Sequence, residues 1–150
     1  MQVSLTRPNS PVLITDFDAL LQESPRTLLY FYPRDNTPGC TLQGQDFTRL
    51  APEFAALGIA VIGVSRDDHA SHLQFQSSCG IGIPLIADDG TLCDRFAVMG
   101  SKNMYGKMIF GLLRSTFLLD QLGTVIQEWR SVRVTGHAEK IFKELSKGAK

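Results

Sequence analysis

The stretch TLLYFYPRDNTPGC, residues 27–40, contains a strand, a turn and the start of a helix in succession. The run from Thr27 to Tyr32 is apolar and aromatic throughout its length, which is typical of a strand covered on both faces. Pro33 ends that strand, and beyond residue 40 apolar residues recur at spacings of three and four, which predicts a helix. Cys40 is therefore expected in the first turn of this helix, where free backbone N–H groups and the helix dipole favour a thiolate.

The composition indicates one globular core. A chain of 150 residues with 43% hydrophobic content leaves little room for a second core, so residues 1–150 are expected to form a single domain. Lys plus Arg and Asp plus Glu both number 15, which argues against binding to nucleic acid or to an anionic membrane surface. No stretch approaches the roughly 20 apolar residues of a membrane span, and residues 1–11 are too polar for a signal peptide. We therefore expect a cytoplasmic protein.

The cysteines indicate redox chemistry. There are three of them, Cys40, Cys79 and Cys93, and no two are spaced as C-x-x-C. An odd number without that spacing fits neither a structural disulfide framework nor a zinc ribbon. A reactive thiol is the better interpretation.

Two hydrophobic periods alternate along the chain, which predicts strands and helices in turn and hence an α/β fold. The expected strands are residues 27–32, 59–64, 83–86, 115–119 and 124–129. The expected helices are residues 41–57, 69–78, 91–98 and 136–147, and a long loop is expected over residues 100–113. This order predicts a thioredoxin-like fold, in which helices flank a central mixed β-sheet and the chain ends in a β-hairpin and a helix.

Residues 30–41, YFYPRDNTPGCT, resemble the active-site segment of the peroxiredoxins, and most closely that of the bacterioferritin comigratory protein, or Q-type, subfamily. Further segments agree with that family in the same order, namely residues 63–67, 71–72, 104–107, 114–120 and 136–139. The resemblance extends over residues 27–147. Residues 1–25 diverge, because the Ala-Pro-x-Phe element with which family members usually open is absent.

The resemblance implies a thiol-dependent peroxidase in which Cys40 attacks the peroxide. Thr37 lies in a turn bounded by two prolines, so its hydroxyl is expected to reach the same pocket as the sulfur. Gly39 and Cys40 supply backbone N–H donors, and Gly39 permits close approach. Arg114 matches the family's essential arginine, which favours the thiolate and binds peroxide oxygen, and Pro33 is expected to shield the site from water.

Gln43 stands where relatives usually carry Glu. Its amide can still orient Arg114 by hydrogen bonding, but it does not neutralise the guanidinium. An unusually electropositive pocket is therefore expected.

A second thiol must resolve the sulfenic acid that forms on Cys40. Many relatives place it five residues after the nucleophile, at Gln45 here, and others place it near Gln76. Cys79 lies one helical turn beyond Gln76 and is the candidate resolving cysteine, with a plain buried cysteine as the alternative. Cys93 is interpreted as structural packing. If neither acts, the enzyme has one catalytic cysteine and an external thiol recycles it.

The predicted activity is reduction of hydrogen peroxide and organic hydroperoxides, with thioredoxin or a similar thiol as reductant and no metal, haem or flavin. A monomer is expected rather than a dimer. One alternative is a peroxide sensor that signals through oxidised Cys40 without efficient turnover. A general disulfide exchanger is a third reading, against which the missing C-x-x-C argues.

Other residues have structural interpretations. His69 and His72 lie beside acidic residues, and surface positions at a helix start are preferred over a metal site. His137 is expected to cap or pack rather than to catalyse. An apolar collar around the substrate and simple loop packing are both open for four residues of the long loop region, Met99, Met104, Tyr105 and Met108.

Overall fold

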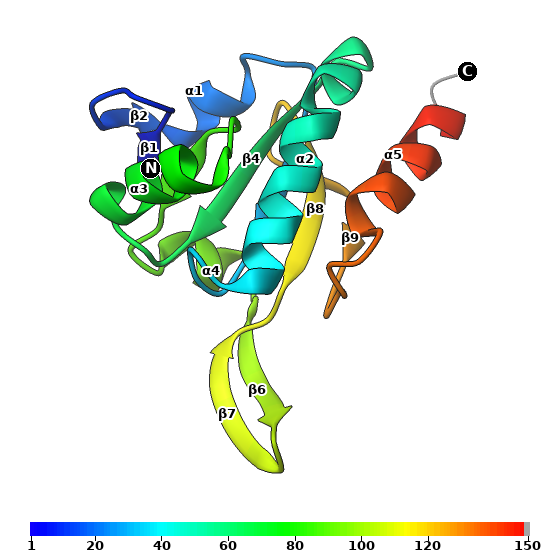
Figure 1. Ribbon diagram of the computed structural model, residues 1–150. Coiled ribbons are helices and arrows are strands. Elements are labelled where there is room, and N and C mark those ends of the chain that lie inside the picture. Colours follow the sequence, from blue (N-terminus) through cyan, green and yellow to red (C-terminus); the bar gives the residue numbers. More distant parts are fainter. Residues whose placement is uncertain (149–150) are drawn as a thin grey trace.

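A seven-stranded mixed sheet forms the centre of the computed structural model, which describes residues 1–148 (Figure 1). From one edge to the other, the strands are β2 (Leu13–Asp16), β1 (Gln2–Thr6), β5 (Leu85–Ala87), β4 (Ile59–Ser65), β3 (Arg26–Phe31), β8 (Ser115–Asp120) and β9 (Val125–Trp129). The helices are α1 (Phe17–Leu21), α2 (Pro38–Ala56), α3 (His69–Cys79), α4 (Thr91–Arg95) and α5 (His137–Gly148). Strands β3, β4 and β5 are parallel, and the other pairings in this sheet are antiparallel.

Strand β3 is buried on both faces, as its apolar sequence predicts. Because side chains alternate along a strand, Leu29 and Phe31 enter one core and Leu28 and Tyr30 enter the other. The first core is closed by residues of α1 and α4, and the second by residues of α2, α3 and α5. The sheet is thus the middle of three layers, and the expected arrangement of flanking helices with a C-terminal hairpin and helix is confirmed.

The pairing between β3 and β8 fixes where the two ends of the candidate site lie. In their antiparallel register, Phe31 at the end of β3 faces Ser115 at the start of β8. Arg114 immediately precedes β8 and therefore lies beside the loop that follows β3. The same loop leads to Cys40.

The predicted long loop over residues 100–113 is wrong. This region forms a second, two-stranded sheet, β6 (Met99–Met104) and β7 (Lys107–Leu112), which projects from the body as an arm in Figure 1. Tyr105 and Gly106 join the strands with φ of 54° and 81°, as a tight hairpin turn requires. Nearly all of β7 is exposed, so the arm lacks the alternation of apolar and polar residues by which a strand is recognised in sequence.

The N-terminal segment completes the sheet despite its divergent sequence. Strand β1 pairs antiparallel with β5, and β2 folds back on β1 as the edge strand. Val3 and Leu5 of β1 enter the first core. The predicted helix over residues 91–98 is shorter than expected and ends at Arg95, after which Ala97 takes a positive φ of 53°.

No helix within residues 1–148 is long and apolar enough to span a membrane.

His137, at the first turn of α5, packs as predicted between the helix and the sheet. Its Nε2 lies 3.0 Å from the hydroxyl of Thr116 on β8, and its ring meets Phe47 of α2 edge-on. Burial, together with the charges of Lys140 and Arg114, lowers the pKa of His137 to about 4. The imidazole is therefore neutral in the folded protein at neutral pH.

Gly63 in β4 has no room for a side chain, because a Cβ there would lie 2.8 Å from both Leu85 Cδ2 and Tyr30 Cζ. Both neighbours are buried, and Tyr30 is stacked on Phe47. Gly63→Ala should therefore lower the free energy of unfolding by about 1–3 kcal/mol in urea titrations. Gly111→Ala on β7 is the matched control, because the nearest atom there is 4.0 Å away. Equal effects of the two substitutions would contradict the packing described for β4.

The low pKa of His137 makes stability depend on pH. Above pH 6.5 the imidazole is neutral in both the folded and the unfolded chain. As the pH falls from 6.5 toward 4, the unfolded chain binds a proton that the folded protein excludes, so stability is lost by up to about 3 kcal/mol. Urea unfolding of wild type and His137→Gln at pH 7 and pH 4.5 measures this loss. A wild-type loss no larger than that of the variant would show that His137 is not responsible.

Candidate active site

Cys40 lies in the first turn of α2, as the sequence predicts. The helix begins at Pro38 with Thr37 as its N-cap residue, and Cys40 is 2% exposed. The Thr37 side chain makes no capping hydrogen bond to the helix. The N-cap hydroxyl therefore leaves the N–H groups of Gly39 and Cys40 free to bind an anion.

Arg114 and Gln43 meet Cys40 from different elements. Arg114 Nη2 lies 3.4 Å from Cys40 Sγ, and Arg114 Nη1 donates to the side-chain oxygen of Gln43. The backbone of Arg114 is held as well, because its carbonyl accepts a hydrogen bond from the N–H of Val132 at 3.1 Å. Within residues 1–148, no carboxylate forms an ion pair with Arg114. Among the described residues, no acidic partner therefore offsets the positive charge of the guanidinium beside the sulfur.

Gly39 lies beside Arg114, and a Cβ at this position would make only ordinary van der Waals contacts. A Cβ on Gly39 would lie 3.4 Å from Arg114 Nη2 and 3.8 Å from Val134. The hydroxyl of Thr37 donates to the carbonyl of Arg34 at 3.1 Å, which holds it within the turn. The reach of Thr37 to a bound peroxide stays a prediction.

Pro33 and Arg114 line one pocket of about 320 Å³. Its other walls come from the base of the β6–β7 arm and from residues 131–132. The apolar collar, one of the two interpretations left open, does not line this pocket: Tyr105 and Met108 are exposed on the arm, and Met99 packs against the first core. The side chain of Met104 lies outside what the structure describes.

Asp35 is buried in the loop that leads to Cys40. The sequence did not indicate it as a functional residue. Its carboxylate accepts hydrogen bonds from the hydroxyls of Tyr32 (2.6 Å) and Ser71 (2.8 Å) and lies 2.7 Å from Nδ1 of His72. Its N–H donates to Asp67 at 2.8 Å. These contacts, which we call the Asp35 cluster, tie the loop to the first turn of α3. The residues are far apart in sequence, so no local pattern indicated the cluster.

The expectation that His72 is a surface residue is wrong, because its side chain is fully buried in the Asp35 cluster. Its Nε2 lies 3.1 Å from the carbonyl oxygen of Ile86 on β5. His69 contacts the hydroxyl of Thr6 through Nδ1 at 2.6 Å. Within residues 1–148, no three His, Cys, Asp or Glu side chains are grouped so as to hold a metal ion.

Cys79 is the last residue of α3 and is partly exposed. Its Sγ lies 3.7 Å from the side-chain oxygen of Asn36, in the loop before Cys40, and its carbonyl accepts a hydrogen bond from Gln45 of α2. The end of α3 therefore lies against both the active-site loop and the first half of α2. Gln76 is buried, and its amide nitrogen donates to the carbonyls of Thr6 and Ile83.

Cys93 lies in the first core and is fully buried. Burial, followed by its hydrogen bond to Asp88, raises the pKa of the thiol to about 12. The thiol is therefore protonated at neutral pH, which agrees with the packing role inferred from the sequence.

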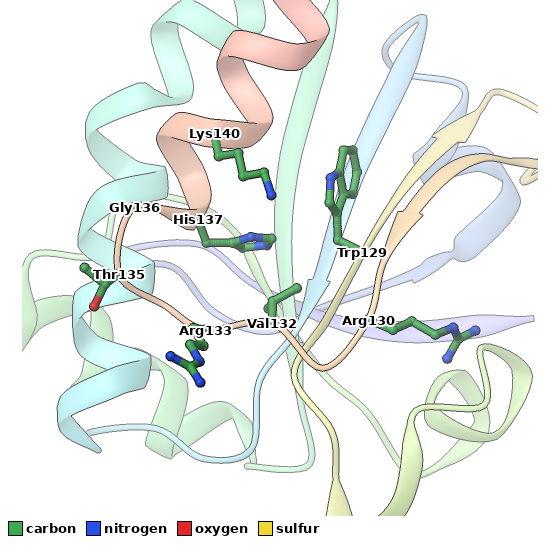
Figure 2. Close-up of a pocket in the computed structure, with 8 residues that line it drawn as sticks. All are labelled: Trp129, Arg130, Val132, Arg133, Thr135, Gly136, His137 and Lys140. Carbon is green, nitrogen blue, oxygen red and sulfur yellow. The ribbon is translucent and has the colours of Figure 1, made fainter.

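A second pocket lies between β9 and the start of α5, and Figure 2 shows Lys140 and His137 extending toward Trp129 across it. Val132 lines both this pocket and the one beside Arg114. None of the site residues predicted from the sequence lines this second pocket.

Comparison with known proteins identifies the family. Residues 13–128 match the model of the AhpC/TSA family. The chain is 49% identical to peroxiredoxin Bcp of Xanthomonas campestris pv. campestris over 124 residues, which are 82% of this chain and 78% of the relative. It is 40% identical to peroxiredoxin Bcp of Bacillus subtilis over 119 residues, which are 79% and 76% of the two chains.

Solved structures give the same result. A peroxiredoxin Q structure from Xanthomonas campestris superimposes with a TM-score of 0.86 at 43% identity, over 100% of this chain and 92% of that one. A cysteine-to-serine mutant of PrxQ from Xylella fastidiosa gives 0.89 at 35% identity, over 100% and 90%. These neighbours confirm the thioredoxin-like fold. Family model, relatives and structures agree with the motif at Cys40, and the chain belongs to the AhpC/TSA family, among the peroxiredoxins of the Bcp or Q type.

Proposed function

We propose that the chain is a thiol-dependent peroxidase whose nucleophile is Cys40. The observation that carries this proposal is the position of the sulfur, in the first turn of α2 and 3.4 Å from a guanidinium that no carboxylate neutralises within the described residues. Helix N-terminus and cation both stabilise negative charge on sulfur. The relatives named peroxiredoxin support the same activity.

The reaction transfers one oxygen atom to sulfur. The Cys40 thiolate attacks the terminal oxygen of a hydroperoxide, the O–O bond breaks, and the sulfur becomes a sulfenic acid. The departing oxygen takes up a proton and leaves as water or an alcohol. Arg114 and the N–H groups of Gly39 and Cys40 supply donors that face the reacting oxygens, and they act where charge develops in the transition state.

Two further residues complete the assignment. We assign Thr37 the role of orienting the peroxide from the turn before Cys40, and Pro33 the role of shielding one side of the site from water. Gln43 holds Arg114 through a hydrogen bond without neutralising it. This neutral partner supports the expectation of an unusually electropositive site.

We assign Cys79 as the resolving cysteine. Two contacts and its position on α3 support this assignment: its sulfur lies 3.7 Å from Asn36 of the active-site loop, its carbonyl accepts a hydrogen bond from Gln45, and it lies one turn beyond Gln76. Gln45 and Gln76 occupy the two positions where relatives are expected to carry the second thiol. A disulfide requires Cα atoms within roughly 7 Å and the Cys40 side chain is buried, so we expect both helix ends to unwind locally when the disulfide forms.

A thiol must then reduce the oxidised enzyme, and we infer that thioredoxin or a similar protein does so. One of the similar Xanthomonas campestris structures is described as giving insights into alkyl peroxide reduction activity, which favours organic hydroperoxides as substrates beside hydrogen peroxide. A monomeric state and a cytoplasmic location stay predictions from the sequence.

The function is tested by peroxide consumption in the presence of excess thioredoxin and its reductase. Wild type should turn over many equivalents, and Cys40→Ser should consume none, because no other thiol has this environment. Cys93→Ala is the control and should retain turnover, since Cys93 is buried in the first core. Oxidation of wild type that stops at one equivalent would favour the peroxide sensor instead. A Cys40→Ser protein that still turns over would overturn the assignment.

The resolving cysteine is tested by peptide mapping after one equivalent of hydrogen peroxide. Wild type should yield a Cys40–Cys79 disulfide. In Cys79→Ser the sulfenic acid should persist, so excess peroxide should convert Cys40 to the sulfinic acid more readily, and Cys93→Ser serves as the matched control. A persistent sulfenic acid in wild type would establish a mechanism with one catalytic cysteine.

A further inference from the structure

The pocket beside Arg114 is larger than hydrogen peroxide needs. It has a volume of about 320 Å³ and lies between the active-site loop and the base of the β6–β7 arm. Arg114 forms one wall, and the same guanidinium lies 3.4 Å from the attacking sulfur. Arg114 is therefore shared by the pocket and by the surroundings of the sulfur, although Cys40 is not among the residues that line the pocket.

Part of the pocket is apolar. Leu112, Leu113 and Val132 contribute to its walls together with Pro33. Such a surface binds hydrocarbon, because contact removes apolar area from water. This part of the pocket suits the organic group of a hydroperoxide.

Lys102 brings a positive charge to the same pocket. In the hairpin register, Lys102 on β6 pairs with Ile109 on β7. Its ammonium nitrogen nevertheless lies 3.4 Å from the carbonyl oxygen of Leu112, which is farther along β7 toward the body of the protein. The side chain passes over Gly111, where its Cε lies 4.0 Å from the position that a Cβ would occupy. Lys102 is thus directed along the arm to the pocket and away from the exposed tip.

The positive charges that line the pocket have no acidic partner among the described residues of its lining. Its lining includes Lys102 and Arg114, and no Asp or Glu is among the described residues that form it. Gln43, the side-chain acceptor for Arg114, is neutral, and the acceptor for Lys102 is a backbone carbonyl. A pocket with an apolar wall and two cations complements a ligand that has both a hydrocarbon group and an anionic group.

We propose that this pocket binds the organic part of hydroperoxides that carry a carboxylate, and that Lys102 determines this specificity by pairing with the carboxylate. The proposal rests on the peroxidase function of Cys40. The chemistry is unchanged: the thiolate takes the terminal oxygen, the O–O bond breaks, and the product is the corresponding hydroxy acid after protonation of the departing alkoxide. The carboxylate does not react.

The test compares two hydroperoxides that differ only in charge, cumene hydroperoxide and its para-carboxylated analogue. The second-order rate constant for oxidation of Cys40 is measured for each by stopped flow, and the ratio of charged to neutral substrate is the readout. Wild type should favour the charged substrate by about tenfold at low salt, which is the effect of about 1.4 kcal/mol, and the preference should shrink as salt is added.

Substitutions on the β6–β7 arm test whether Lys102 causes the preference for the charged hydroperoxide. Lys102→Met keeps the length of the side chain and removes the charge, so the ratio should fall several-fold, and Lys102→Arg should restore most of it. Lys107→Met is the matched control, because Lys107 is exposed on the same arm and is absent from the pocket lining. A ratio near one in wild type, or an unchanged ratio in Lys102→Met, would overturn the proposal.

The same experiment separates this proposal from the proposed function. If neither hydroperoxide nor hydrogen peroxide oxidises Cys40, the peroxidase assignment itself fails. If both organic hydroperoxides are reduced at equal rates, the peroxidase assignment stands and only the role of Lys102 is excluded.

Discussion

The register between β3 and β8 is the constraint on which the site depends. These strands are neighbours in the interior of the sheet, and their pairing sets Phe31 opposite Ser115. One strand leads to Cys40 and the other begins just after Arg114, so the register brings sulfur and guanidinium together although they are 74 residues apart. A slip by one residue would turn every side chain of β8 to the opposite face. The two cores that sandwich β3 therefore hold the chemistry in place as well as the fold.

Much of this arrangement could be predicted from sequence, because the decisive signals are local. The apolar run before Pro33 and the helical spacing after residue 40 locate Cys40 at a helix start without any tertiary information. Arg114 could be recognised only through its resemblance to the family, since nothing in residues 113–115 alone indicates a partner. Its contact with Cys40 is a product of sheet pairing, which single-sequence patterns do not encode.

The features that the sequence did not reveal have a common physical cause. The β6–β7 arm is exposed along most of β7, so burial imposes no alternating pattern on its residues. The Asp35 cluster has the opposite character, because it is polar and buried, and its members come from separate segments. His72 was misassigned because a histidine in the first turn of a helix has the same sequence signature whether it faces water or a buried carboxylate. Only the packing of α3 against the loop distinguishes the two cases.

The Asp35 cluster also divides α3 into two parts. His72 anchors the first turn to the active-site loop, while Cys79 ends the helix about two turns later. Helix ends fray at much lower free energy than helix interiors, and Gln76 marks the last buried attachment before the end. Fraying beyond Gln76 would release Cys79 while the attachment at His72 remains intact. Release of the Cys79 end of α3 therefore leaves the contact between His72 and Asp35 in place, so the loop before Cys40 stays anchored while the two thiols meet.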